Sequence, residues 1–149
     1  MTRARRLRGA CVGYTFGVFD LFNVEHLDLL RQAATHCDEL VVAVADDDLV
    51  RRSGGPVPFT PHDERMAIVG SVRGVGRVVP LDTWDLAAAA REVGAEVLLT
   101  VTNGDAVQRA ADPAAETAGI RVHRLIPRRR SASRTVRGAL GPSGRNAVA

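Results

Sequence analysis

Residues 13–26, GYTFGVFDLFNVEH, decide the fold of this chain. The apolar run at residues 10–16 predicts a buried strand, Gly17 predicts a turn, and the spacing of apolar residues predicts a helix over residues 24–36. Backbone N–H groups and the helix dipole meet where such a turn enters a helix, and both favour a phosphate group. The stretch therefore predicts a strand–turn–helix unit that suits an anionic ligand.

Outward from this unit, predicted strands and helices alternate along the chain. Further strands are expected at residues 39–45, 77–81, 96–101 and 121–126, and further helices at 61–72, 83–93, after Gly104 with a break or bend near Pro113, and weakly at 133–140. This alternation predicts an α/β fold: a single doubly wound, Rossmann-like and mainly parallel sheet with helices on both faces.

Local signals predict how three of these helices begin. The run Asp46-Asp47-Asp48 is interpreted as the cap of a helical turn, with a Mg²⁺ site as the alternative. Thr60 is expected to cap a helix that opens at Pro61, and Trp84 is expected near the start of the following helix, packing against the core.

The sequence predicts a basic N-terminal tail at residues 1–9, one α/β domain at 10–140 and a disordered tail at 141–149. The basic N-terminus is not followed by the apolar stretch of a secretory signal, and no apolar run is long enough to cross a bilayer. Two cysteines, Cys11 and Cys37, are expected as buried thiols. A cytoplasmic protein without a membrane partner is therefore expected.

All 20 basic residues of the chain are arginines. Many lie in two clusters, at residues 3–8 and 128–137, which could form a patch for nucleic acid. No aromatic residues are interleaved with them, so nucleic acid is not the expected partner. Without lysine, neither a Schiff base nor a lysine phosphate clamp is available.

Residues 17–22, GVFDLF, followed by His26, resemble the motif of the cytidylyltransferase-like nucleotidyltransferase family, particularly its glycerol-3-phosphate cytidylyltransferases. In that motif the turn precedes a His-x-Gly-His sequence at the start of a helix. The Glu64-Arg65 helix and the Ser/Thr-containing residues 131–135 resemble later family segments, so the likeness covers about residues 11–138 and the domain at 10–140 is expected to be nucleotidyltransferase-like.

The resemblance implies transfer of CMP from CTP to a small phosphorylated alcohol, such as glycerol 3-phosphate, with release of pyrophosphate; AMP transfer is the less favoured variant. His26 is then the catalytic residue. The nucleotide-binding residues implied are Thr15, Phe16, Gly17, Phe19, Asp20, Asn23, Arg65 and Ser133. Mg²⁺ is expected on the nucleotide phosphates, without a metal site made by the protein itself, and a homodimer is possible.

The chain departs from the family pattern at four positions. Asn23 replaces the first histidine and Glu25 replaces the glycine, while Gly54 stands where many members have a lysine and Arg134 where a hydroxyl is usual. Asn23 has a second interpretation as a helix N-cap, and Glu25 as a surface residue that complements the helix dipole.

These departures leave two alternative functions. One is a nucleotide- or partner-binding relative that has lost catalysis; the other is a different reaction with Glu25 and His26 as an acid–base pair, although neighbouring helical residues do not face each other. Arg65 and Arg73 have the alternative of pairing with Asp63 and Glu64. His36, His62 and His123 lack metal-ligand spacing and are interpreted as structural.

Overall fold

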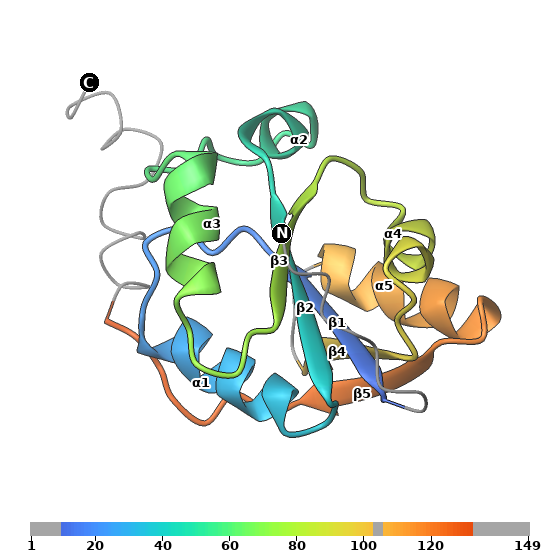
Figure 1. Ribbon diagram of the computed structural model, residues 1–149. Helices are drawn as coiled ribbons and strands as arrows, with labels where there is room; N and C mark the ends of the chain where they lie inside the picture. Colours follow the sequence, from blue (N-terminus) through green and yellow to red (C-terminus); the bar gives the residue numbers. More distant parts are fainter. Residues whose placement is uncertain (1–9, 103–105, 133–149) are drawn as a thin grey trace.

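Five parallel strands form one sheet in the computed structural model, which describes residues 10–102 and 106–132. The strand order is β3-β2-β1-β4-β5, as Figure 1 shows. The strands are β1 (Val12–Gly17), β2 (Glu39–Ala45), β3 (Arg77–Leu81), β4 (Val97–Val101) and β5 (Arg121–Leu125). The parallel, Rossmann-like α/β fold predicted from the sequence is confirmed.

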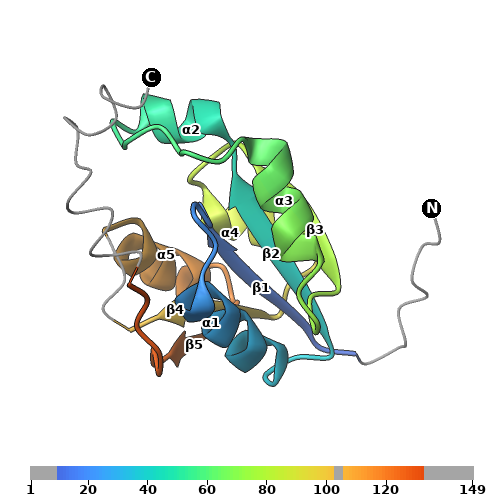
Figure 2. The ribbon, with the colours of Figure 1, turned by 90° about the vertical axis from the view of Figure 1, so that its left-hand side faces the viewer.

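Helices cover both faces of this sheet. They are α1 (Val24–Ala34), α2 (Asp47–Arg52), α3 (His62–Gly70), α4 (Leu86–Glu92) and α5 (Ala106–Thr117). Helices α1 and α3 lie on one face and α4 and α5 on the other, and the turned view of Figure 2 shows the same two layers.

Two buried clusters make the core, one on each face of the sheet. Alternate residues of β1 and β2, such as Tyr14 and Val41, pack beneath α4 and α5 with Leu86 and Ala115. The other residues of β2, such as Val42, pack with Leu30 of α1 and Val69 of α3. A central strand that is covered on both faces is uniformly apolar, which is why β2 was visible in the sequence as a continuous run.

Carboxylates begin two of the helices. Asp46 caps α2 by accepting a 2.6 Å hydrogen bond from the N–H of Leu49, and Asp85 caps α4 through the N–H of Ala88. The predicted capping role of the Asp46–Asp48 run is therefore confirmed at Asp46.

Two predicted helix starts were wrong. Pro61, not Thr60, is the N-cap of α3, and no side chain caps that helix; Thr60 instead gives its N–H to a carboxylate of the β1–α1 turn. The helix predicted from residue 83 starts later: Trp84 precedes the N-cap Asp85 and bonds to Ser53 through its indole N–H. Trp84 packs against the core, as predicted.

Helix α5 contains Pro113 within its bounds and is not divided there. The predicted helix at residues 133–140 and the tails at 1–9 and 141–149 lie outside the described residues. In the described part of the chain, no helix has the length and apolar character needed to cross a membrane.

Candidate functional site

The turn between β1 and α1 lies at the point where the order of the strands across the sheet reverses. Strand β1 pairs with β2 on one side and β4 on the other: the chain continues from β1 to β2 and β3 on one side, and then crosses to β4 and β5 on the other. Ligands of open α/β sheets bind at such a point, beyond the carboxyl ends of the strands. Gly17 ends β1 and Asn23 begins α1, so the predicted phosphate-binding turn occupies this position.

Asn23 and His26 form a reciprocal capping box at the start of α1. The side chain of Asn23 accepts the N–H of Glu25 at 2.9 Å, and Nδ1 of His26 accepts the N–H of Asn23 at 3.3 Å. An imidazole nitrogen that accepts a hydrogen bond has no proton, so the neutral ring keeps its proton on Nε2. The capping interpretation of Asn23 is confirmed, and the same box fixes the tautomer of His26.

Two aromatic rings hold the imidazole of His26. The ring centroids of Phe19 and Phe22 lie 5.7 Å and 5.4 Å from that of His26. A Cβ on Gly17 would stand 3.0 Å from Cε2 of Phe19, so the glycine leaves room for this ring. Gly17 therefore positions Phe19, and Phe19 in turn supports His26.

Asp20 stabilises an otherwise strained turn. Phe19 and Leu21 have φ values of 56° and 49°, in the left-handed region that side chains other than glycine rarely adopt. Between them the buried carboxylate of Asp20 accepts N–H groups from Leu21 at 3.1 Å and from Phe59 and Thr60 at 3.0 Å each. Asp20 thus ties the turn to the loop before α3; its predicted nucleotide contact stays a prediction.

Arg65 joins three segments around the same turn. Its side chain is fully buried, and Nη1 donates to the carbonyls of Val18 and Ala45 at 2.7 Å each. Nε donates to the carbonyl of Thr60, and Nη2 pairs with Asp47 at 2.5 Å. The predicted alternative partners, Asp63 and Glu64, are therefore wrong for Arg65. The structure makes Arg65 a residue that positions the turn, and its predicted phosphate contact stays a prediction.

Glu25 lies beneath the chain that follows β5. It is 9% exposed, and its Oε2 accepts the backbone N–H of Ser131 at 3.5 Å. The interpretation of Glu25 as a surface residue is therefore wrong, because a segment more than a hundred positions away covers it.

The remaining predicted residues divide into two groups. The hydroxyl of Thr15 donates to the carbonyl of Leu99 at 2.9 Å, and Phe16 packs in the core, so both side chains point into the protein. Ser133 and Arg134 lie outside the described residues. Gly54 has a φ of 74° in the loop after α2.

The candidate metal ligands do not gather into one site. Asp46 caps α2, Asp47 pairs with Arg65, and Asp48 pairs with Arg51 and Arg52. Among the described residues, no group of three or more histidine, cysteine or acidic side chains could hold a metal ion. His62 contacts the carbonyl of Val44 at 2.9 Å, while the rings of His36 and His123 lie 3.8 Å apart on the surface.

Fold and site together define a Rossmann-like α/β protein with a glycine turn at the carboxyl end of its central strand, and comparison with known families identifies its class. The model of the family described as cytidylyltransferase-like matches residues 14–135. The chain belongs to this family.

Relatives with assigned names match part of the chain. The bifunctional protein HldE of Shewanella sediminis is 43% identical over 76 residues, which is 50% of this chain and 16% of that protein. The HldE protein of Granulibacter bethesdensis is 40% identical over 72 residues, 48% of this chain and 15% of that protein. The chain thus spans a small fraction of the length of these relatives.

A solved structure shares the fold over its whole length. The lipopolysaccharide core biosynthesis protein from Thermoplasma volcanium superposes with a TM-score of 0.69 and 23% identity, covering 83% of this chain and 100% of that one. This similarity supports the fold.

Sequence reasoning missed two features of the site. The Arg65–Asp47 pair joins residues 18 positions apart, so no local sequence pattern predicts it. The contact between Glu25 and Ser131 had a partial signal, since Glu25, Asp28 and Gln32 follow the spacing of one helix face.

Proposed function

We propose that this protein transfers a nucleotidyl group to the phosphate of a small phosphorylated alcohol and releases pyrophosphate. The favoured variant is the transfer of CMP from CTP. The main supporting observation is the orientation of the His26 imidazole. Its capping box fixes the ring at the N-terminus of α1, directly after the Gly17 turn. AMP transfer from ATP is the competing outcome, and membership of the cytidylyltransferase-like family supports the reaction type.

In the proposed reaction an oxygen of the acceptor phosphate attacks the α-phosphorus, and the bond to pyrophosphate breaks. Little covalent chemistry is required of the protein, so positioning and stabilisation of charge supply most of the rate. Nε2–H of His26 donates to a phosphate oxygen as charge develops there. Mg²⁺, held by the nucleotide phosphates, neutralises further charge.

Asn23 and Arg65 support this chemistry indirectly in our proposal. Asn23 fixes the tautomer of His26 by giving its N–H to Nδ1, and Arg65 fixes the carbonyl of Val18 next to the turn. Both are positioning residues here, and Gly17 leaves room for the ring of Phe19 beside His26.

A second candidate function is nucleotide or partner binding without transfer. The observation that favours it is the buried carboxylate of Glu25 next to the turn, because a carboxylate repels a triphosphate. The third possibility, an acid–base pair of Glu25 and His26, loses support because the two side chains bond to different segments, Ser131 and Asn23.

The test is a pyrophosphate-release assay with CTP, ATP, GTP and UTP, Mg²⁺ and a panel of phosphorylated alcohols. We expect release with one nucleotide that depends on the acceptor, together with a nucleotidylated product. Binding of a nucleotide without release for any acceptor would favour the second candidate. The predicted cytoplasmic homodimer belongs to the same proposal, and sedimentation of the purified chain tests the dimer.

A further inference from the structure

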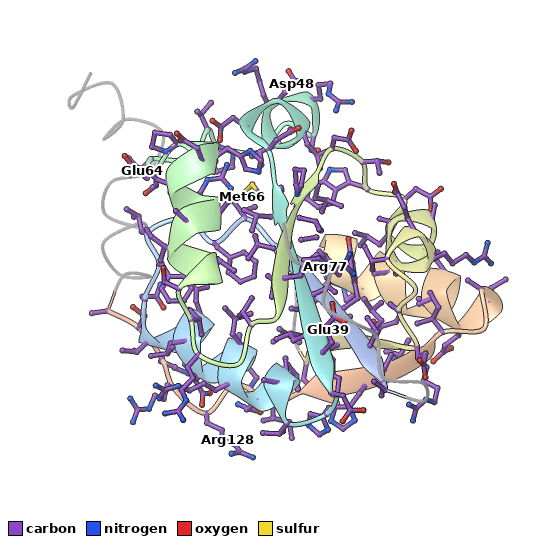
Figure 3. All side chains as sticks on the ribbon, in the orientation of Figure 1. Glu39, Asp48, Glu64, Met66, Arg77 and Arg128 are labelled. Atoms are coloured by element: carbon purple, nitrogen blue, oxygen red, sulfur yellow. The ribbon has the colours of Figure 1, made fainter. Side chains whose placement is uncertain are left out.

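The segment after β5 is bound along helix α1 by three side chains in succession. We call residues 126–132 the strap. In Figure 1 it leaves β5 and follows the outer side of α1 toward the start of that helix. Figure 3 shows that Arg128, within the strap, points away from the domain.

Each of the three contacts is a hydrogen bond to the backbone of the strap. Nε2 of Gln32 donates to the carbonyl of Ile126 at 3.1 Å, and Oδ2 of Asp28 accepts the N–H of Arg128 at 3.2 Å. Oε2 of Glu25 accepts the N–H of Ser131 at 3.5 Å. Positions 32, 28 and 25 lie on one face of α1, so the strap runs antiparallel to the helix.

The first two contacts support each other, and the third is the long one. Gln32 also donates to Asp28 at 2.9 Å, which fixes both side chains. Pro127 restricts the backbone between the two attachment points. At 3.5 Å the contact with Glu25 lies at the upper limit of hydrogen-bond length, so it is the longest of the three contacts.

We propose that Glu25 is a positioning residue for the nucleotide site: its carboxylate holds the end of the strap against the start of α1, beside His26 and the phosphate-binding turn. The strap carries Arg128, Arg129 and Arg130, all exposed. Holding this segment in place keeps a positively charged stretch of chain beside the first two turns of α1, which offsets the charge of Glu25 itself.

The effect on nucleotide binding rests on the proposed function, whereas the attachment of the strap does not. Glu25 stands where the family motif has glycine, so it replaces a residue without a side chain by one that reaches the strap. In this account the substitution adds an attachment, and reverting it weakens nucleotide binding.

Limited digestion with trypsin tests the attachment without any ligand. Trypsin cleaves after arginine, and the strap contains three arginines in a row. Cleavage requires the segment to detach, so its rate follows the population of the open form. Replacing Glu25 by Ala is expected to speed cleavage after residues 128–130 by about tenfold, the scale of one lost hydrogen bond to a charged group.

Two further variants identify the contact responsible. Glu25→Gln keeps an oxygen that accepts the N–H of Ser131, so it should be cleaved more slowly than Glu25→Ala. Glu64→Ala removes an exposed carboxylate on the outer side of α3, away from the strap (Figure 3), and should be cleaved like the unaltered protein. Equal cleavage of Glu25→Ala and Glu64→Ala would overturn the proposal.

Nucleotide binding then tests the second step. For Glu25→Gly we expect the KM for the nucleotide to rise several-fold with a smaller change in kcat, and Glu25→Gln should recover part of the loss. A lower KM in Glu25→Gly would overturn the positioning role and favour a decayed motif. If neither the unaltered protein nor any variant binds a nucleotide, the proposed function fails, while the digestion result still decides whether Glu25 holds the strap.

Discussion

At the scale of single residues, the site depends on side chains whose hydrogen bonds fix one another. His26 is oriented by the N–H of Asn23 and by the rings of Phe19 and Phe22. Asp20 is oriented by three backbone N–H groups. Small changes at these positions therefore act on geometry as well as on chemistry.

Replacing His26 by Ala should lower kcat by about 10²–10³, because one preorganised donor to the developing charge is lost. Circular dichroism should show the fold intact, since Asn23 still caps the helix. Steady-state pyrophosphate release measures the effect. Turnover equal to that of the unaltered protein would show that His26 takes no part in the reaction.

Arg65→Met should destabilise the protein by about 3–5 kcal/mol, because Asp47 and the carbonyls of Val18, Ala45 and Thr60 lose their donor. Urea unfolding measures the loss. Arg73→Met, at an exposed arginine beyond α3, is the matched control and should change stability by less than about 0.5 kcal/mol. Similar small losses in both variants would contradict the positioning role of Arg65.

The only tyrosine of the chain, Tyr14, supplies a pH-dependent signal. Burial, and secondly the negative charge of Glu92, hold the pKa of Tyr14 well above its ordinary value near 10. A raised pKa in the folded state means that the neutral phenol contributes stability below about pH 10, the unfolded value. That stability decreases as the pH rises toward the folded pKa.

Above pH 10 the folded protein should therefore show no phenolate absorbance at 295 nm. This absorbance should appear only when the circular dichroism signal of the folded protein is lost. Ionisation near pH 10 with an intact fold would show that the phenol of Tyr14 is accessible. Tyr14→Phe is the matched control and should lack the absorbance change.

At the scale of the elements, close packing between β1 and the end of α1 explains one glycine. A Cβ on Gly13 would stand 2.6 Å from Sγ of Cys37, closer than atoms can approach. Gly13→Ala should cost about 1–3 kcal/mol by overpacking. Because Cβ of Cys37 would also stand within 2.9 Å, the double variant is Gly13→Ala/Cys37→Gly, in which part of the overpacking loss should return relative to the sum of the single variants, as measured by thermal unfolding. Strictly additive losses would contradict the clash.

The elements were predictable from the sequence where the local pattern and the tertiary structure agree. Strands β2 and β3 lie at the predicted residues, and β2 is the clearest case because it is a continuous Val-rich run that is buried beyond Glu39. The start of α3 was missed because Thr60 gives its N–H to Asp20, forty positions earlier. The burial of Glu25 was missed for the same reason, since the strap that covers it comes from the far end of the domain.

At the scale of the whole molecule, the strand order places the candidate site beyond the carboxyl end of the central strand β1. The β1–α1 turn, the loop before α3 and the strap approach one another there, and Arg65, Asp20 and Glu25 tie them together. The position of the turn followed from the sequence, because a glycine turn between a buried strand and a helix is a local pattern. The hydrogen bonds between these segments could not be predicted from the sequence, because each joins residues that are distant in the chain.

The central claim is that a nucleoside triphosphate binds at the β1–α1 turn, and thermal unfolding with CTP, ATP, GTP and UTP, each with and without Mg²⁺, tests it most directly. A ligand at about 100 times its dissociation constant adds roughly 2.7 kcal/mol of stability. We predict a higher Tm with one nucleotide and Mg²⁺, with most of the shift lost in His26→Ala. An unchanged Tm with all four nucleotides, or a shift of equal size in His26→Ala, would contradict the account.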